Sequence, residues 1–118
     1  MDKENKLKER CKKFALSILR LADTVPNTIS GRAISSQLIR AATSVGANYR
    51  AACRGRSKAD FIAKLGIVLE EADECDYWLE LLVDARLIKK EDAHLCRIEA
   101  DELTAIMTAN IKTARMNK

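Results

Sequence analysis

Apolar residues recur every three or four positions along four stretches of the chain, and this spacing constrains the fold more than any other feature. The clearest series runs from Phe61 to Leu82 through Leu65, Val68, Ala72, Cys75 and Leu79. Such spacing places the apolar side chains on one side of an α-helix, whereas a half-buried strand alternates at every second residue. The segment that follows Ser57 is therefore predicted to be a helix with one buried side.

Three further segments show the same periodicity and are predicted to be helices. They cover residues 3–22, residues 30 or 32 to 54, and residues 89 or 90 to 116. Their apolar stripes consist, in chain order, of Leu7, Cys11, Phe14, Ile18 and Leu21; of Ile34, Leu38, Ala41, Val45, Tyr49 and Ala52; and of Leu95, Ile98, Leu103, Ile106 and Ile111.

Local signals separate the first three helices. Pro26 removes a backbone donor and disfavours helix at Val25, so the first helix ends before it. Gly55 is expected to be a left-handed cap of the second helix. Ser57 is expected to be the N-cap of the third, with Asp60 three residues later in the position of a capping-box acid.

Length and composition favour a single all-α domain. The chain has 118 residues, one proline and 4% aromatic residues, which is a low aromatic content for a sandwich or barrel. Short connections make consecutive helices antiparallel. The predicted fold is an antiparallel up-down four-helix bundle that spans residues 1–118 as one domain.

The expected location is cytoplasmic, without a membrane role. No apolar run approaches the roughly 20 residues of a membrane span, and the charged first residues precede no apolar signal region. The cysteines are far apart in sequence and form no CxxC pair, so free thiols are expected at Cys11, Cys53, Cys75 and Cys96.

Charge is distributed unevenly between the second and third helices. No acid occurs between Asp23 and Asp60, whereas residues 60–84 contain eight acids and one lysine. At about 100° per residue, the arginines of the second helix fall within an arc of roughly 80° opposite its apolar stripe. The outward basic row, extended by two residues of the following turn, consists of Arg32, Arg40, Arg50, Arg54, Arg56 and Lys58.

Two interpretations of this row remain open. In the first interpretation, the row follows a phosphate backbone and binds RNA or DNA, largely through counterion release. Alternatively, it is the solvated face of a bundle helix, and its arginines pair with acids of the third helix or of another subunit.

The third helix has a second apolar face, nearly opposite the first, formed by Ile67, Trp78, Leu81 and Ala85. Tryptophan is enriched at protein interfaces, which favours a contact between subunits. The alternative is that Trp78 covers the end of the bundle or a loop.

Residues for catalysis or cofactor binding are sparse, so no enzymatic activity and no cofactor are expected. His94 lies two residues from Cys96, and this spacing puts them on different sides of a helix. Glu70, Glu71 and Glu74 could bind a divalent ion, but the Glu-x-x-His pattern of bundle metal sites is missing, and so are the common nucleotide-binding and hydrolase motifs.

Residues 35–88 resemble the four-helix bundle protein family, which includes proteins encoded in intervening sequences of bacterial large-subunit ribosomal RNA genes. The resemblance rests on QLIRAA at 37–42, SVGAN at 44–48 and GRSKADF at 55–61. The family is similar to accessory proteins of diversity-generating retroelements. In place of the commoner IAEG after Asn48, this chain has Tyr49, Arg50, Ala51 and Ala52, so a role of that glutamate does not carry over.

The resemblance implies a small cytosolic bundle that assembles into a ring, commonly a homopentamer. The retroelement relatives bind nucleic acid and a reverse transcriptase, so RNA, DNA, a reverse transcriptase or another protein are the partners it suggests. A third hypothesis is a protein-protein adaptor or scaffold, in which the basic and acidic helices dock complementary surfaces.

Overall fold

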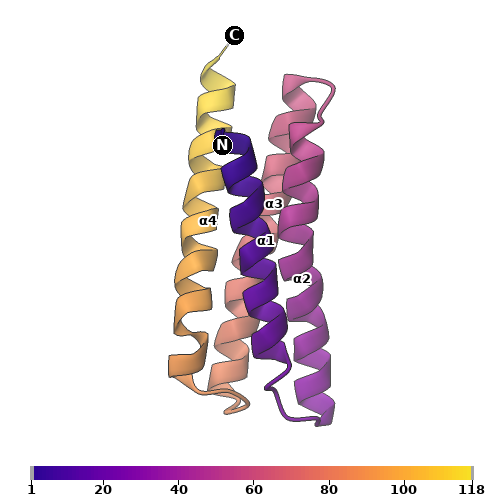
Figure 1. Ribbon diagram of the computed structural model, residues 1–118, viewed down its shortest axis with the longest axis vertical. Coiled ribbons are helices and arrows are strands. Elements are labelled where there is room, and N and C mark those ends of the chain that lie inside the picture. Colours follow the sequence, from indigo (N-terminus) through magenta and orange to yellow (C-terminus); the bar gives the residue numbers. More distant parts are fainter. Residues whose placement is uncertain (1, 118) are drawn as a thin grey trace.

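The computed structural model describes residues 2–117, and within them the chain forms four α-helices. These are α1 (Lys3–Ala22), α2 (Ile29–Cys53), α3 (Lys58–Asp84) and α4 (Lys90–Met116). They run alternately down and up along a bundle with extents of 50 × 23 × 20 Å (Figure 1). The predicted antiparallel four-helix bundle is confirmed. Among residues 2–117, no helix combines the length and the apolar character needed to cross a membrane.

The buried core follows the predicted stripes of α1, α2 and α3. Each of these helices contributes a series of side chains at heptad-like spacing, including Phe14 and Ile18, Leu38 and Val45, and Leu65 and Leu79. Burial of this continuous apolar surface is the main force that holds the helices together.

The expected stripe of α4 is wrong in its first half. Leu95 is 77% exposed and Ile98 is 42% exposed, whereas Ala93, Cys96 and Ala100 are buried in their place. Small residues let the helix axis lie close to its neighbours, so the side of α4 that carries them faces the core. Further along, Leu103, Met107 and Ile111 continue the same buried side.

The turn between α2 and α3 confirms one expected cap and corrects another. Ser57 is the N-cap of α3, and its Oγ accepts a hydrogen bond from the backbone N–H of Asp60 at 3.1 Å. Gly55, however, is not left-handed, because no glycine of the described chain has a positive φ. A Cβ on Gly55 would lie 3.0 Å from the Ala52 carbonyl oxygen and 3.0 Å from Asp60 Oδ2, so glycine allows this tight turn by its size.

Candidate nucleic-acid interface

Three segments that are distant in sequence meet at one end of the bundle. The start of α1, the α2–α3 connection and the end of α4 all lie at the upper end of Figure 1. We call residues 2–12, 50–60 and 112–117 the basic end. Its basic residues are Lys3, Lys6, Lys8, Arg10, Lys12, Arg50, Arg54, Arg56, Lys58, Lys112 and Arg115, and its acids are Asp2, Glu4, Glu9 and Asp60.

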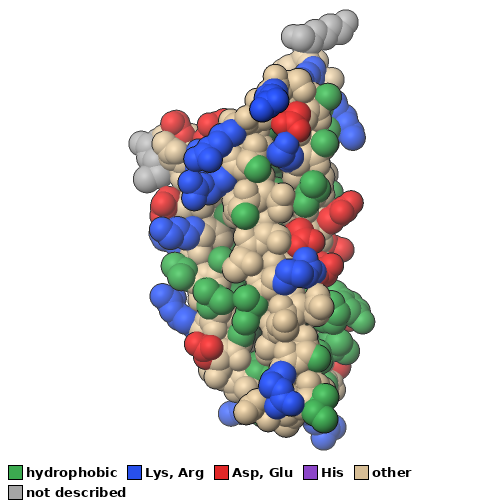
Figure 2. All heavy atoms as spheres, turned by 90° about the vertical axis from the view of Figure 1, so that its right-hand side faces the viewer, with side chains coloured by type: hydrophobic (Ala, Val, Ile, Leu, Met, Phe, Trp, Pro, Cys, Tyr) green, Lys and Arg blue, Asp and Glu red, His purple; other side chains and the backbone are tan. Residues whose placement is uncertain are grey.

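Four of the six residues of the predicted basic row belong to this end. Arg50, Arg54, Arg56 and Lys58 are all exposed, and within residues 2–117 none of them forms a salt bridge. On the α2 side of the molecule, basic side chains gather toward the same upper end (Figure 2). These cations are therefore available to an anionic partner.

Grooves between the helices bring further lysines beside these arginines. Arg50 lines a groove of about 640 Å³ between α1 and α2, together with Lys8 and Lys12. Arg54 and Arg56 line a hollow of about 520 Å³ at the α2–α3 turn. Each groove presents cations from two segments, so the basic surface is broader than a single helix face.

Acids also line these grooves: Glu9 lies in the groove between α1 and α2, and Asp60 lies in the hollow at the α2–α3 turn. Asp60 lines the same hollow as Arg54 and Arg56, and its Oδ1 accepts a hydrogen bond from Lys64 Nζ at 2.6 Å. That bond, with a smaller contribution from Arg56, lowers the pKa of the Asp60 carboxyl. Asp60 therefore stays ionised. It offsets the charge of Lys64 more than the charges of Arg54 and Arg56, because it is directly paired with Lys64.

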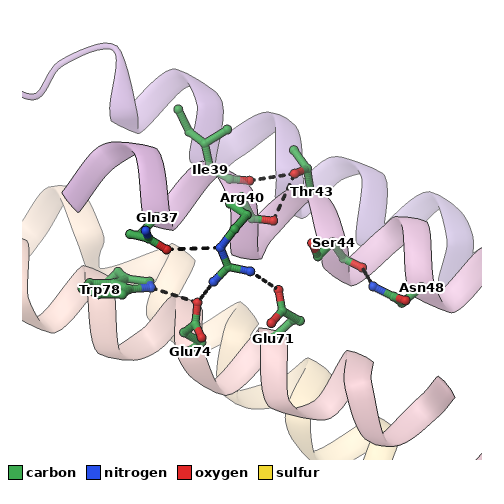
Figure 3. Close-up of polar contacts among 9 residues, drawn as sticks. All are labelled: Gln37, Ile39, Arg40, Thr43, Ser44, Asn48, Glu71, Glu74 and Trp78. Atoms are coloured by element: carbon green, nitrogen blue, oxygen red, sulfur yellow. Dashed lines mark hydrogen bonds and ion pairs between the residues drawn. The ribbon is translucent and has the colours of Figure 1, made fainter. Parts of the chain in front are cut away.

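Arg40 lies near the middle of α2 and is occupied by side chains of its own chain (Figure 3). It donates from Nη1 to Glu71 Oε2 at 2.9 Å, from Nη2 to Glu74, and from Nε to Gln37 Oε1 at 3.1 Å. Trp78 Nε1 also donates to Glu74, at 3.1 Å. At this position the structure matches the interpretation in which the basic row pairs with acids of the third helix.

Arg32, the first residue of the predicted row, lies at the opposite end of the bundle. It is exposed in the first turn of α2, where its Nη1 donates to Asn27 Oδ1 at 3.0 Å. The row is thus divided into a free basic end, a paired Arg40 and a distant Arg32. A single phosphate backbone that follows α2 would meet acids at its midpoint.

Two other arginines join helices in the way Arg40 does. Arg10 on α1 binds Glu99 and Glu102 of α4, and these carboxylates raise its pKa. Arg97 on α4 binds Asp76 and Glu80 of α3 in the same manner, and its pKa is raised too. In each case one guanidinium bridges two carboxylates about one turn apart, which suits its planar fork of donors.

Of the three carboxylates that the sequence offered for a divalent ion, Glu71 and Glu74 are engaged in the Arg40 bridge, whereas Glu70 is exposed. Glu71 and Glu74 both point at Arg40, and Glu71 retains only 16% of its side-chain exposure. Among residues 2–117, no group of three or more histidine, cysteine, aspartate or glutamate side chains is arranged to hold a metal ion. His94 is exposed whereas Cys96 is buried, so the two point in different directions as expected.

The cysteines are free within the described residues. Burial raises the pKa of the Cys11 and Cys75 thiols to about 12 and also raises that of Cys96. A thiol in such surroundings is a poor nucleophile near neutral pH, because the thiolate is the reactive form.

The second apolar face of α3 is accessible along the outside of the bundle. Ile67 is 43% exposed, Ala85 is exposed, and Trp78 and Leu81 are partly buried. Tyr77, which the sequence reading did not include, is 55% exposed and packs edge-to-face against Trp78 with ring centroids 5.1 Å apart. The face therefore presents two adjacent aromatic rings to its surroundings.

The lysines of α1 and the end of α4 are the functional candidates that sequence reasoning missed. The clearest are Lys3, Lys6, Lys8 and Lys12, together with Lys112 and Arg115. Their signal was present in the predicted topology, because an up-down bundle places the start of the first helix, the end of the second, the start of the third and the end of the fourth at one pole. Charge counted one helix at a time does not show this convergence.

Comparison with known proteins agrees with the fold. Residues 3–109 match the family described as 23S rRNA-intervening sequence protein. A crystal structure of a protein of unknown function from the S23 ribosomal protein family of Bacteroides thetaiotaomicron is 37% identical, with a TM-score of 0.86, over 94% of this chain and 99% of that chain. No curated protein matches the sequence. The chain belongs to the 23S rRNA-intervening sequence protein family.

Proposed function

We propose that this protein is a non-enzymatic, homo-oligomeric helical bundle that binds nucleic acid through its basic end. The observation that carries the proposal is the convergence of basic side chains from three segments, with Arg50, Arg54, Arg56 and Lys58 free of salt bridges within residues 2–117. Arg32 and Arg40 of the sequence-predicted row are not part of this proposed site.

A phosphate backbone is the partner that suits such a surface. Exposed cations held close together create a positive potential, and when they neutralise the phosphates of a polyanion they release the counterions condensed on it, which favours binding. Contacts of this kind read charge and not base sequence. Binding is therefore expected to tolerate many sequences and to weaken steeply with salt.

Assembly into a ring is the second part of the proposal. The exposed face with Ile67, Tyr77, Trp78 and Leu81 supports it, since paired aromatic residues beside aliphatic ones are typical of interface cores. The family resemblance favours a pentamer. A ring would repeat the basic end around its axis, so that contacts too weak to hold alone act together on one strand.

The test is a salt titration of oligonucleotide binding followed by fluorescence anisotropy. Labelled single-stranded RNA, single-stranded DNA, duplex DNA and a fragment of 23S rRNA are titrated with protein from about 50 to 200 mM salt. The test variant combines Arg50→Gln with Arg54→Gln. The control combines Arg20→Gln with Lys89→Gln, which removes the same charge from exposed positions at the other end.

The Arg50/Arg54 variant is expected to lower the slope of log affinity against log salt by about 1.4 on single strands and about 1.8 on duplex DNA, since each lost phosphate contact contributes about 0.7 or 0.9. The control is expected to change the slope little. Equal losses in the two variants would show that net charge alone is responsible. Absence of binding to every probe at low salt would leave the adaptor or scaffold hypothesis.

A further inference from the structure

A groove opens between α1 and α4 at the basic end. It has a volume of about 550 Å³ and is lined by all four helices. α1 and α4 pack less extensively than the other adjacent helix pairs do, and the groove opens between them. The groove therefore joins the solvent to the last apolar layer of the bundle.

Two of the chain's few aromatic side chains lie in this layer. Tyr49 of α2 and Phe61 of α3 line the groove, with Leu7 and Ile106 beside them. Tyr49 is only 4% exposed, whereas Phe61, Leu7 and Ile106 are partly buried. Aromatic side chains thus lie at the inner edge of the basic surface.

The rim of the groove is polar and mainly basic. Lys3, Lys6 and the acid Glu4 come from the first turns of α1, and Asn110, Thr113 and Asn117 come from the end of α4. Arg10 also lines the groove, but its guanidinium is held by Glu99 at 2.7 Å and by Glu102 at 3.2 Å. Arg10 thus fixes the distance between α1 and α4, while the two lysines remain at the opening.

We infer that this groove accepts an unpaired nucleobase, so that the nucleic acid bound at the basic end is single-stranded. The inference rests on the proposed function and names its substrate class. A nucleobase has a flat apolar face for Phe61 and a polar edge for the amides and hydroxyl of α4. Its phosphate would lie at the rim with Lys3 and Lys6.

Duplex DNA or RNA does not fit this arrangement. Its bases are stacked and paired inside the helix, so it can offer phosphates to the rim but no free base to the groove. A base that contacts an aromatic ring typically gains about 5- to 150-fold in affinity, and this gain depends little on which base it is. The same surface can therefore be tolerant of sequence and selective for single strands.

The decisive experiment compares two strands with the same number of phosphates. One is an oligouridylate of about 16 nucleotides, a length typical of single-strand sites, and the other has an abasic tetrahydrofuran residue at every nucleotide. The unaltered protein is expected to bind the strand with bases at least about 5-fold more tightly. Equal affinity for the two strands would overturn the inference while leaving the proposed function intact.

Substitution of the two phenylalanines supplies a matched pair of variants. Phe61→Leu removes the ring from the groove and keeps an apolar side chain, and Phe14→Leu makes the same change at a position that lines a different groove. Phe61→Leu is expected to lower affinity for the oligouridylate about 5-fold or more and to leave affinity for the abasic strand unchanged. Equal effects of the two substitutions would contradict a role of Phe61 in base binding.

Photo-crosslinking gives a readout that does not depend on any variant. An oligomer containing 5-iodouridine is irradiated with the unaltered protein, and the modified peptide is identified by mass spectrometry. Crosslinks to the peptides that contain Tyr49 or Phe61 are expected. Crosslinks only to peptides outside the groove would refute the inference, and failure of all strands and duplexes to bind would instead refute the proposed function.

Discussion

Arg40→Gln separates a structural role of the arginine row from a role in nucleic-acid binding. In the structure Arg40 bridges Glu71 and Glu74 of α3 and also binds Gln37. Its positive charge is already neutralised by carboxylates, so few counterions are released if a phosphate approaches. The substitution is therefore expected to cost folding stability and to leave nucleic-acid binding nearly unchanged.

The expected loss of stability follows from the exposure of the three side chains. Arg40 is 47% exposed and Glu74 is 35% exposed, so their pair resembles a surface salt bridge that contributes at most about 1 kcal/mol. Glu71 is only 16% exposed and loses a hydrogen-bond donor in a less hydrated place, which costs about 1 kcal/mol more. Together these effects lower the free energy of unfolding by about 1–2 kcal/mol, or roughly 4–8 °C in Tm for a chain of this size.

Urea denaturation followed by circular dichroism measures this loss, and a double-mutant cycle with Glu71→Gln assigns it to the pair. The loss should shrink in about 1 M salt, where charges are screened within about 3 Å. Arg54→Gln serves as the comparison, because Arg54 is exposed and forms no salt bridge within residues 2–117. It should lower the salt slope of single-strand binding by about 0.7 with little change in stability. An Arg40→Gln variant with unchanged Tm and an equally reduced slope would refute this reasoning and restore the continuous arginine row.

Three further predictions concern assembly, buried thiols and glycine positions. If the chain assembles as proposed, Trp78→Glu should dissociate the assembly, so that light scattering gives the 13.2 kDa monomer with helical content retained. An oligomer of unchanged mass would argue against this face as the subunit interface. Burial raises the pKa of Cys11 and Cys75 from 9.0 to about 12, so their contribution to stability is complete below pH 9 and is lost above it. Between pH 9 and 12 the free energy of unfolding should fall by roughly 1.4 kcal/mol per thiol for each pH unit. Both thiols should react with a disulfide reagent at pH 8 only after denaturation. Gly66→Ala should stabilise the protein by up to about 1 kcal/mol, because the added Cβ would meet no atom within 4 Å. Gly31→Ala should destabilise it, because the added Cβ would lie 2.3 Å from the carbonyl oxygen of Pro26. Thermal denaturation that ranked the two variants in the reverse order would contradict both predictions.

Sequence periodicity predicted the helices well because the core of a bundle is built from regular stripes. The first helix was expected at residues 3–22 and is found at Lys3–Ala22. The second begins slightly earlier than expected, at Ile29, because Thr28 is its N-cap and accepts a hydrogen bond from the backbone N–H of Gly31. Helix ends are thus set by single side chains that a periodic pattern does not contain.

Two predictions were wrong, the buried side of α4 and the conformation of Gly55, and in both cases the structure depends on packing that the local pattern does not describe. Leu95 and Ile98 are strongly apolar, yet the small residues on the next side of α4 allow closer packing and take the buried position. Gly55 was assigned a positive φ from its place after a helix, whereas the nearby Asp60 carboxylate and Ala52 carbonyl require only that it lack a side chain. Both neighbours of Gly55 are close to it in sequence, but their distances from it depend on the conformation of the turn.

The candidate site shows the same dependence on topology. The outward direction of Arg40 follows from helical geometry, but its partners lie 31 and 34 residues away on α3. Conversely, Lys3 and Lys6 are far from Phe61 in sequence and share a groove with it only because α1 and α3 both begin at the same pole. A charge pattern on one helix therefore cannot define a binding surface in an up-down bundle. The surface is defined by the helix ends that the topology brings together, and at this pole those ends supply cations, an aromatic ring and an opening between them.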